Sequence, residues 1–254
     1  MLDHLPSHIL VITAVFLLAG AVKGLTGMGL PTVAMGALGA VMPPVAAASL
    51  LVIPSFVTNV WQLFAGPSFR KLAARLWLMM VGILIGTIAG ARVLTGADTA
   101  LTTAGLGAAL VLYAASSLFG RTWAMQAWRI PPSAERWLSP LVGLTTGLVT
   151  GSTGVFVIPA VPYLQALDLD KEDLIQALGL SFTVSTIALA IGLARGGAFS
   201  TQQLTASVVA LAPALAGMWL GQIARKRISP TTFRRWFLVC LALLGAELMV
   251  RSLL

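Results

Sequence analysis

Long apolar runs alternate with short polar connections along the whole chain. Most of the runs hold about 20 residues, the length at which a helix crosses about 30 Å of hydrocarbon. This pattern predicts an all-α polytopic membrane protein. The eight runs are Ile9–Met42, Val45–Ala65, Leu72–Ala91, Ala100–Phe119, Leu138–Leu167, Leu174–Ala194, Leu204–Ile223 and Phe237–Val250.

The first and fifth runs are longer than the others and are interrupted by glycine and proline. We call Gly20–Pro31 the first break and Gly147–Pro159 the second break. Glycine frees the backbone and proline removes a donor, and at membrane depth such backbone persists only inside protein or beside a wet cavity. Each long run is therefore either one tilted span with a stub or a hairpin of two shortened helices.

The two breaks indicate an internal repeat. Gly20, Gly24 and Gly27 recur 127 positions later as glycines of the second break, and serine, phenylalanine and further glycine matches follow at slightly larger offsets. We expect two homologous halves, 1–120 and 138–254, joined by a linker at 121–137. Each half has a broken first segment and three further transmembrane helices.

The distribution of Lys and Arg favours an inverted repeat. If each long run crosses the membrane once, the connections on the two sides carry eight and seven of these cations. If each enters and returns or crosses twice, the numbers become twelve and three, and the positive-inside rule prefers this arrangement. It places the linker in the cytoplasm and both termini outside. The three outer cations are Arg92, Arg195 and Arg251.

Composition agrees with a membrane protein and removes several function classes. Residues are 58% hydrophobic and 9% charged, against about 25% charged in soluble domains. The net charge of +8 lies in short connections, so it indicates topology and no nucleic-acid partner. The single Cys240 excludes an internal disulfide, and no spacing typical of a metal site, a cofactor site or a catalytic group is present. We therefore expect no enzyme.

Lys23 is the only ionisable residue deep in the first run. A lysine at this depth is costly and usually faces a functional cavity, although snorkelling to an interface is the alternative. Around it, backbone amides and hydroxyls of both breaks form a candidate anion site, and close helix packing is the alternative role of these glycines. The candidate residues are Gly24, Thr26, Gly27 and Gly29 in the first break and Gly151, Ser152, Thr153 and Gly154 in the second.

Polar residues also share one helical face in the second run. Ser55, Thr58, Asn59 and Gln62 are spaced three, four and seven apart, and Ser181, Ser185 and Thr186 are their counterparts in the second half. Hydroxyls and amides suit an oxoanion, and they also serve as interhelical hydrogen bonds. We add Ser55, Asn59, Gln62, Ser181 and Ser185 to the candidate substrate-binding residues.

The form G-x-x-K-G-x-x-G-x-G-x-P of the first break, with a weaker copy in the second, resembles the TauE/SafE family of sulfite exporters. The resemblance covers essentially the whole chain in length, hydropathy and repeat spacing. It implies a multi-pass permease of the bacterial inner membrane for sulfite, an organosulfonate or a related sulfur anion, and two four-span halves, which our charge count disputes. The second break reads Gly-Ser-Thr-Gly, where many relatives carry more glycines.

The sequence thus predicts a permease that holds a small sulfur-containing anion at the bilayer midplane between the two breaks. The alternatives are an ion-coupled carrier for another small organic anion, such as a carboxylate, and a membrane-embedded enzyme acting on lipid. The expected partners are the anion and the lipid bilayer, and a homodimer is an option.

Overall fold

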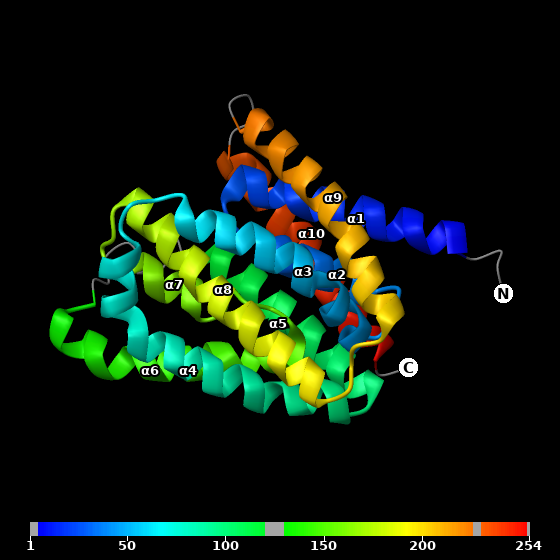
Figure 1. Cartoon of the computed structure of the whole chain (residues 1–254), viewed down its shortest axis with the longest axis horizontal. Coiled ribbons are helices and arrows are strands. Elements are labelled where there is room, and N and C mark those ends of the chain that lie inside the picture. Colours follow the sequence, from blue (N-terminus) through cyan, green and yellow to red (C-terminus); the bar gives the residue numbers. More distant parts are fainter. Residues whose placement is uncertain (1–4, 120–129, 226–229, 253–254) are drawn as a thin grey trace.

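The computed structural model describes residues 5–119, 130–225 and 230–252, which hold ten helices and no strand. The predicted linker at 121–137 therefore lies partly outside the described residues. The helices pack side by side into one bundle (Figure 1). Their bounds are α1 Leu5–Thr26, α2 Leu30–Gly39, α3 Pro44–Phe64, α4 Phe69–Gly96, α5 Thr99–Phe119, α6 Pro132–Thr153, α7 Ala160–Gln165, α8 Lys171–Arg195, α9 Thr201–Ala224 and α10 Pro230–Arg251.

Six of these helices are long and apolar enough to cross a membrane: α1, α3, α4, α5, α8 and α9. Of the two short helices, α2 begins inside the first break and α7 directly follows the second, and α6 and α10 each have 22 residues. The multi-pass helical fold predicted from the runs is confirmed. At ten residues, α2 is about 15 Å long, half the thickness of the hydrocarbon layer.

Glycines let two pairs of helices approach to backbone contact. A Cβ added to Gly86 of α4 would lie 2.3 Å from the carbonyl oxygen of Leu144 in α6. On the other side of the bundle, a Cβ on Gly217 of α9 would lie 2.0 Å from the carbonyl oxygen of Leu17 in α1. Any larger residue would force these helices apart, so the glycine spacing of α4 and α9 serves packing, as small residues at four-residue spacing predict.

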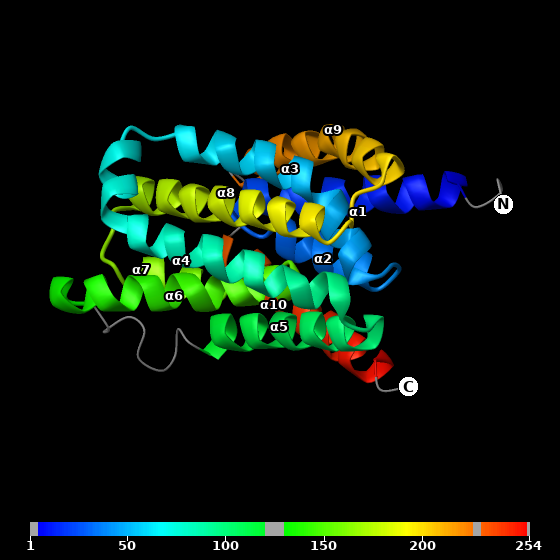
Figure 2. The ribbon, with the colours of Figure 1, turned by 60° about the horizontal axis from the view of Figure 1, so that its bottom comes forward.

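The remaining long helices also pair, α3 with α8 and α5 with α10. Helices α3 and α8 run antiparallel, because Gly179 approaches Leu63 while Thr186 bonds Asn59. The start of α1 and the end of α10 lie at one end of the bundle, and the turn between α3 and α4 lies at the other (Figures 1 and 2).

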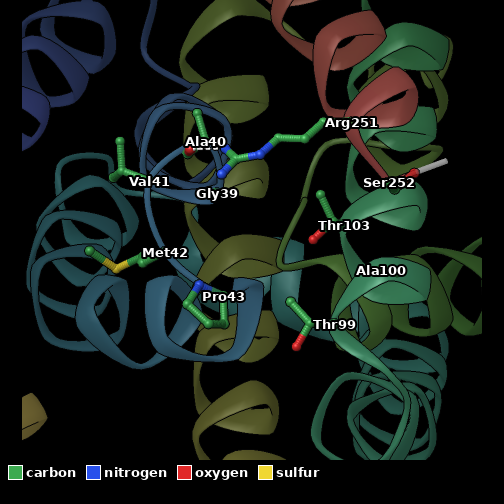
Figure 3. Close-up of a pocket in the computed structure, with 10 residues that line it drawn as sticks. All are labelled: Gly39, Ala40, Val41, Met42, Pro43, Thr99, Ala100, Thr103, Arg251 and Ser252. Atoms are coloured by element: carbon green, nitrogen blue, oxygen red, sulfur yellow. Dashed lines mark hydrogen bonds between the residues drawn. The ribbon is translucent and has the colours of Figure 1, made fainter. Parts of the chain in front are cut away.

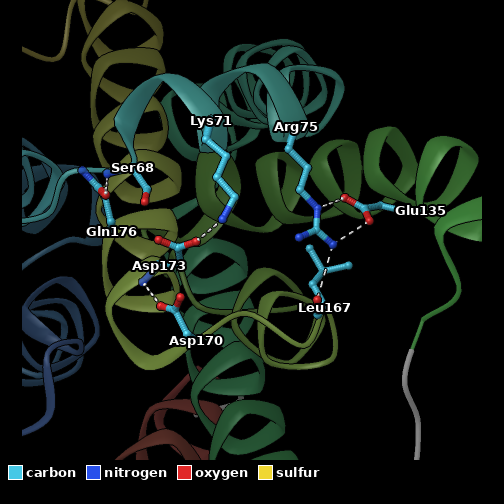
Figure 4. Close-up of polar contacts among 8 residues, drawn as sticks. All are labelled: Ser68, Lys71, Arg75, Glu135, Leu167, Asp170, Asp173 and Gln176. Atoms are coloured by element: carbon cyan, nitrogen blue, oxygen red, sulfur yellow. Dashed lines mark hydrogen bonds and ion pairs between the residues drawn. The ribbon is translucent and has the colours of Figure 1, made fainter.

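Ion pairs tie the helices together at the end opposite the termini (Figure 4). Arg75 of α4 donates two hydrogen bonds of 2.8 Å to the carboxylate of Glu135 in α6 and one of 3.3 Å to the carbonyl of Leu167. Lys71 pairs with Asp173 of α8 at 2.8 Å. These contacts join the beginning of α4 to both α6 and α8.

Candidate functional site

The first break contains a tight backbone turn at residues 27–29, between the end of α1 and the start of α2. Gly27 has a φ of 78° and donates from its amide to the carbonyl of Lys23 at 2.7 Å, which ends α1. The hydroxyl of Thr26 accepts from the amide of Met28 at 3.3 Å and bonds the carbonyl of Val22 at 2.9 Å. Gly29, with a φ of 102°, precedes α2. A left-handed turn of this kind is one that glycine adopts without steric cost.

The second break ends α6 in the same way. Gly154 has a φ of 70° and donates to the carbonyl of Thr150 at 2.7 Å. The hydroxyl of Thr153 accepts from the amide of Val155 at 3.2 Å and donates to the carbonyl of Val149 at 2.6 Å. A Cβ added to Gly154 would lie 2.8 Å from the side chain of Met35, so the second break packs against α2, the helix that begins in the first break.

Three further candidates of the breaks lie inside helices. The backbone of Gly24 packs on the carbonyl of Met218 in α9, and that of Gly151 packs on the carbonyl of Thr87 in α4. Ser152 donates its hydroxyl to the carbonyl of Leu148 at 2.7 Å, within α6. Close helix packing therefore accounts for glycine at both positions.

The structure brings Lys23 together with polar residues of α3 and α8. The side chain of Lys23 is only 3% exposed, and its ammonium donates to the amide oxygen of Asn59. The amide nitrogen of Asn59 in turn donates to the hydroxyl of Thr186 at 3.1 Å. This chain joins α1, α3 and α8 in the interior, so Lys23 does not snorkel to an interface.

Buried hydroxyls without partners also lie on α3 and α8, near Asn59 and Thr186 in sequence. Ser55 lies one helical turn before Asn59, and Ser185 directly precedes Thr186; both are fully buried, and within the described part of the chain neither oxygen has a hydrogen-bond partner. The same holds for Ser181, one turn before Ser185. We call this set the central polar cluster; it consists of Lys23, Ser55, Asn59, Ser181, Ser185 and Thr186. Buried hydroxyls without partners are costly and uncommon, so each needs an explanation.

Gln62 and Thr58 make other contacts. Gln62 donates to the carbonyl of Ile175 in α8 at 3.0 Å, while its amide oxygen is buried without a partner. Thr58 bonds the carbonyl of Pro54 in its own helix. Sequence reasoning missed Thr32 of α2, whose hydroxyl is fully buried and also unpartnered. Its place directly after Pro31 of the first break was the available signal.

The central polar cluster supplies one cation, an amide and hydroxyls, and no carboxylate. Such a set can neutralise and hydrogen-bond a small oxoanion, because its members offer a positive charge and donors. Within the described residues no group of three His, Cys, Asp or Glu side chains could hold a metal ion.

Comparison with known proteins supports the same class of molecule. The family model described as sulfite exporter TauE/SafE matches residues 12–248, nearly the whole chain, which confirms the family predicted from the breaks. No curated protein and no solved structure matches the chain. With its multi-pass helical fold, the chain belongs to the TauE/SafE family of membrane transporters for sulfite and other anions.

Proposed function

We propose that this protein is a permease of the bacterial inner membrane that moves sulfite or a small organosulfonate. The observation that carries the proposal is the buried ammonium of Lys23, hydrogen-bonded to Asn59 of α3, a helix that together with α8 also carries buried hydroxyls without partners. An ionisable residue inside a membrane bundle marks a solute pathway by default. A sulfite or sulfonate group offers three oxygens, which can accept from the ammonium and from several hydroxyls at once.

In this proposal the breaks position the cluster. Each break ends a helix inside the bundle, so the backbone at Gly27, Gly29 and Gly154 turns where a continuous helix would present only side chains. Amides at the start of α2 complement the ammonium for a negatively charged group, because the amides of Gly27 and Gly154 already donate within their own helix ends. Gly24 and Gly151 contribute the close helix contacts that hold the breaks in place.

We further propose that the two halves, 1–120 and 138–254, are inverted repeats that rock against each other. Three features support this. Helix α4 packs on α6 as α9 packs on α1, which is the pairing that a two-fold relation between the halves requires. Thr26–Gly27 and Thr153–Gly154 form matching helix ends. The matching helices α1 and α6 start at opposite ends of the bundle (Figures 1 and 2).

The same arrangement supports a topology with both termini outside. The bundle end that carries Lys71, Arg75 and the start of α6 would face the cytoplasm, following the positive-inside rule. Arg92, Arg195 and Arg251 would face the outside. An anion leaving a negative interior gains about 2.3 kcal/mol per charge per 100 mV, which favours export and makes uniport possible.

Flux into proteoliposomes tests the substrate class. The purified protein is reconstituted, and uptake of labelled sulfite, methanesulfonate, taurine and a dicarboxylate is measured at pH 7.5 with and without a pH gradient, with protein-free vesicles as control. We expect saturable flux of sulfite or a sulfonate that exceeds dicarboxylate flux at least about tenfold. Faster dicarboxylate flux would instead identify a carboxylate carrier, and no flux above the control would reject the permease.

A further inference from the structure

A pocket of about 330 Å³ lies at the bundle end that carries the termini, away from the central polar cluster (Figure 3). It lies between the end of α2 with the following turn, the beginning of α5 and the end of α10. Its chemistry comes from Arg251, Thr99, Thr103 and Ser252, and apolar residues form the rest of the wall. None of these polar residues belongs to the candidate substrate site.

Arg251 gives the pocket a positive charge, and no carboxylate among the described residues pairs with it. Within the described residues, its guanidinium makes no ion pair and donates to the carbonyl of Ala40, at the end of α2. Glu247, four residues earlier on α10, is exposed and does not pair with it. The guanidinium has five N–H donors, so a single carbonyl leaves most of its capacity for a ligand.

The beginning of α5 adds a second set of donors. Thr99 is the first residue of α5, and Thr103 lies one turn later with its side chain directed to the same pocket (Figure 3). Asp98 precedes α5 but does not line the pocket. Two hydroxyls at the beginning of a 21-residue helix and a guanidinium therefore line one cavity.

Helix α2 connects the pocket wall to the first break. Helix α2 begins at the first break and ends at Gly39 and Ala40 in the pocket wall, a length of about 15 Å.

We propose that this pocket is an anion-binding vestibule at the membrane face, in which Arg251, Thr99 and Thr103 hold the sulfite or sulfonate group before or after passage. The inference rests on the proposed function for the identity of the solute. An oxoanion group could also come from a lipid headgroup, and the experiment separates the two sources.

Cysteine labelling measures the electrostatic preference of the pocket without transport. Thr103→Cys is made in a Cys240→Ser background, which removes the single native cysteine. The rate at which the introduced thiol reacts with the anionic reagent sulfonatoethyl methanethiosulfonate is divided by its rate of reaction with the cationic trimethylammonioethyl reagent. Thr201→Cys is the matched control, because Thr201 is exposed, begins α9 and does not line the pocket.

We expect the anionic-to-cationic ratio at Thr103→Cys to exceed that at Thr201→Cys about fivefold, since a partly shielded charge changes local anion concentration by such a factor. Adding Arg251→Gln should remove the difference, Arg251→Lys should keep most of it, and Arg92→Gln, which removes an exposed arginine outside the pocket, should leave it intact. Equal ratios at the two cysteines, or no effect of Arg251→Gln, would overturn the proposal.

Protection separates the two anion sources. In nanodiscs of neutral lipid, millimolar methanesulfonate should slow anionic labelling of Thr103→Cys and not of Thr201→Cys. If labelling instead slows only when phosphatidylglycerol is included, the ligand is a lipid headgroup and the vestibule is rejected.

Transport measures whether the pocket serves the solute. In proteoliposomes, Arg251→Gln should raise the KM for transport about fivefold with kcat unchanged. Protection without any flux in the wild-type protein would reject the proposed function and leave the anion site standing.

Discussion

The two breaks are built alike and used differently. In both, a threonine hydroxyl accepts the amide two residues ahead, and a glycine with positive φ ends the helix. Three residues before these threonines the breaks diverge, with Lys23 in the first and Thr150 in the second. Lys23 reaches across to Asn59 on α3, whereas Thr150 donates to the carbonyl of Val155 within its own break at 3.2 Å.

The comparison shows that the glycine turn, which both breaks share, is independent of the charge of Lys23, which only the first break has. The glycine turn is needed twice because each half must end a helix inside the bundle. The charge is present once, and it connects α1 with α3 and α8. We infer that the first break carries the anion chemistry and that the second mainly supports α2, against which Gly154 packs.

Removing the charge should have the largest effect. Lys23→Ala should lower anion flux about 100-fold, since losing a buried charge-assisted hydrogen bond costs roughly 3 kcal/mol. The matched control is Thr150→Val, at the equivalent position of the second break, which should keep at least about half of the flux. Flux is measured in proteoliposomes and folding by size-exclusion chromatography. Equal losses in the two variants would contradict the assignment of the chemistry to the first break.

Placing a negative charge beside the ammonium of Lys23 should have the next largest effect on anion flux. Asn59→Asp changes one atom of the side chain and places a carboxylate beside Lys23, where it competes with the transported anion for the ammonium. We expect flux to fall about 30-fold with little change in melting temperature. The double variant Lys23→Ala with Asn59→Asp should be no better than Lys23→Ala alone, and a gain of flux in Asn59→Asp would show that the pair does not bind anion.

Substituting the packing glycines Gly24 and Gly151 by alanine should lower the stability of the protein by similar amounts. Alanine at Gly24 or Gly151 places a Cβ about 2 Å from a backbone carbonyl of the neighbouring helix, so each should destabilise the protein by about 1 to 3 kcal/mol. Gly96→Ala is the control, because its added Cβ meets no atom within 4 Å. Melting in detergent measures the three variants. A loss confined to one of the two packing positions would argue that the halves are not structurally equivalent.

Removing the unpartnered hydroxyls should have the smallest effect on transport. It should raise KM without lowering the melting temperature. Ser55→Ala or Ser185→Ala removes a buried group that lacks a partner, so the melting temperature should stay equal or rise slightly. Each should nevertheless raise KM about threefold, because one hydrogen bond to the anion is lost. Ser207→Ala is the control for a buried serine that does have a partner, the carbonyl of Leu50, and it should lower stability without raising KM. Unchanged KM in both test variants would remove these serines from the site.

Sequence patterns were sufficient for the architecture of this protein. Run length predicted a multi-pass helical bundle, and the first break indicated the family. These features are local, since hydrophobic length and small-residue spacing act within one helix or between two adjacent faces. The roles of individual site residues were harder to predict, because the sequence does not distinguish Gly24 and Gly151, which pack against neighbouring helices, from the glycines of the turns.

The partners of Lys23 depended on the tertiary structure. Its position in the first run left two roles open, and only the packing of α1 against α3 and α8 places the ammonium on Asn59 and Asn59 on Thr186. The pocket at Arg251 likewise combines α2, α5 and α10, which are distant in sequence. A membrane segment determines by its own composition that it will be a helix at a given depth. Which of its faces meets which neighbour is determined by the joint packing of the helices, because lipid and protein interior are almost equally apolar.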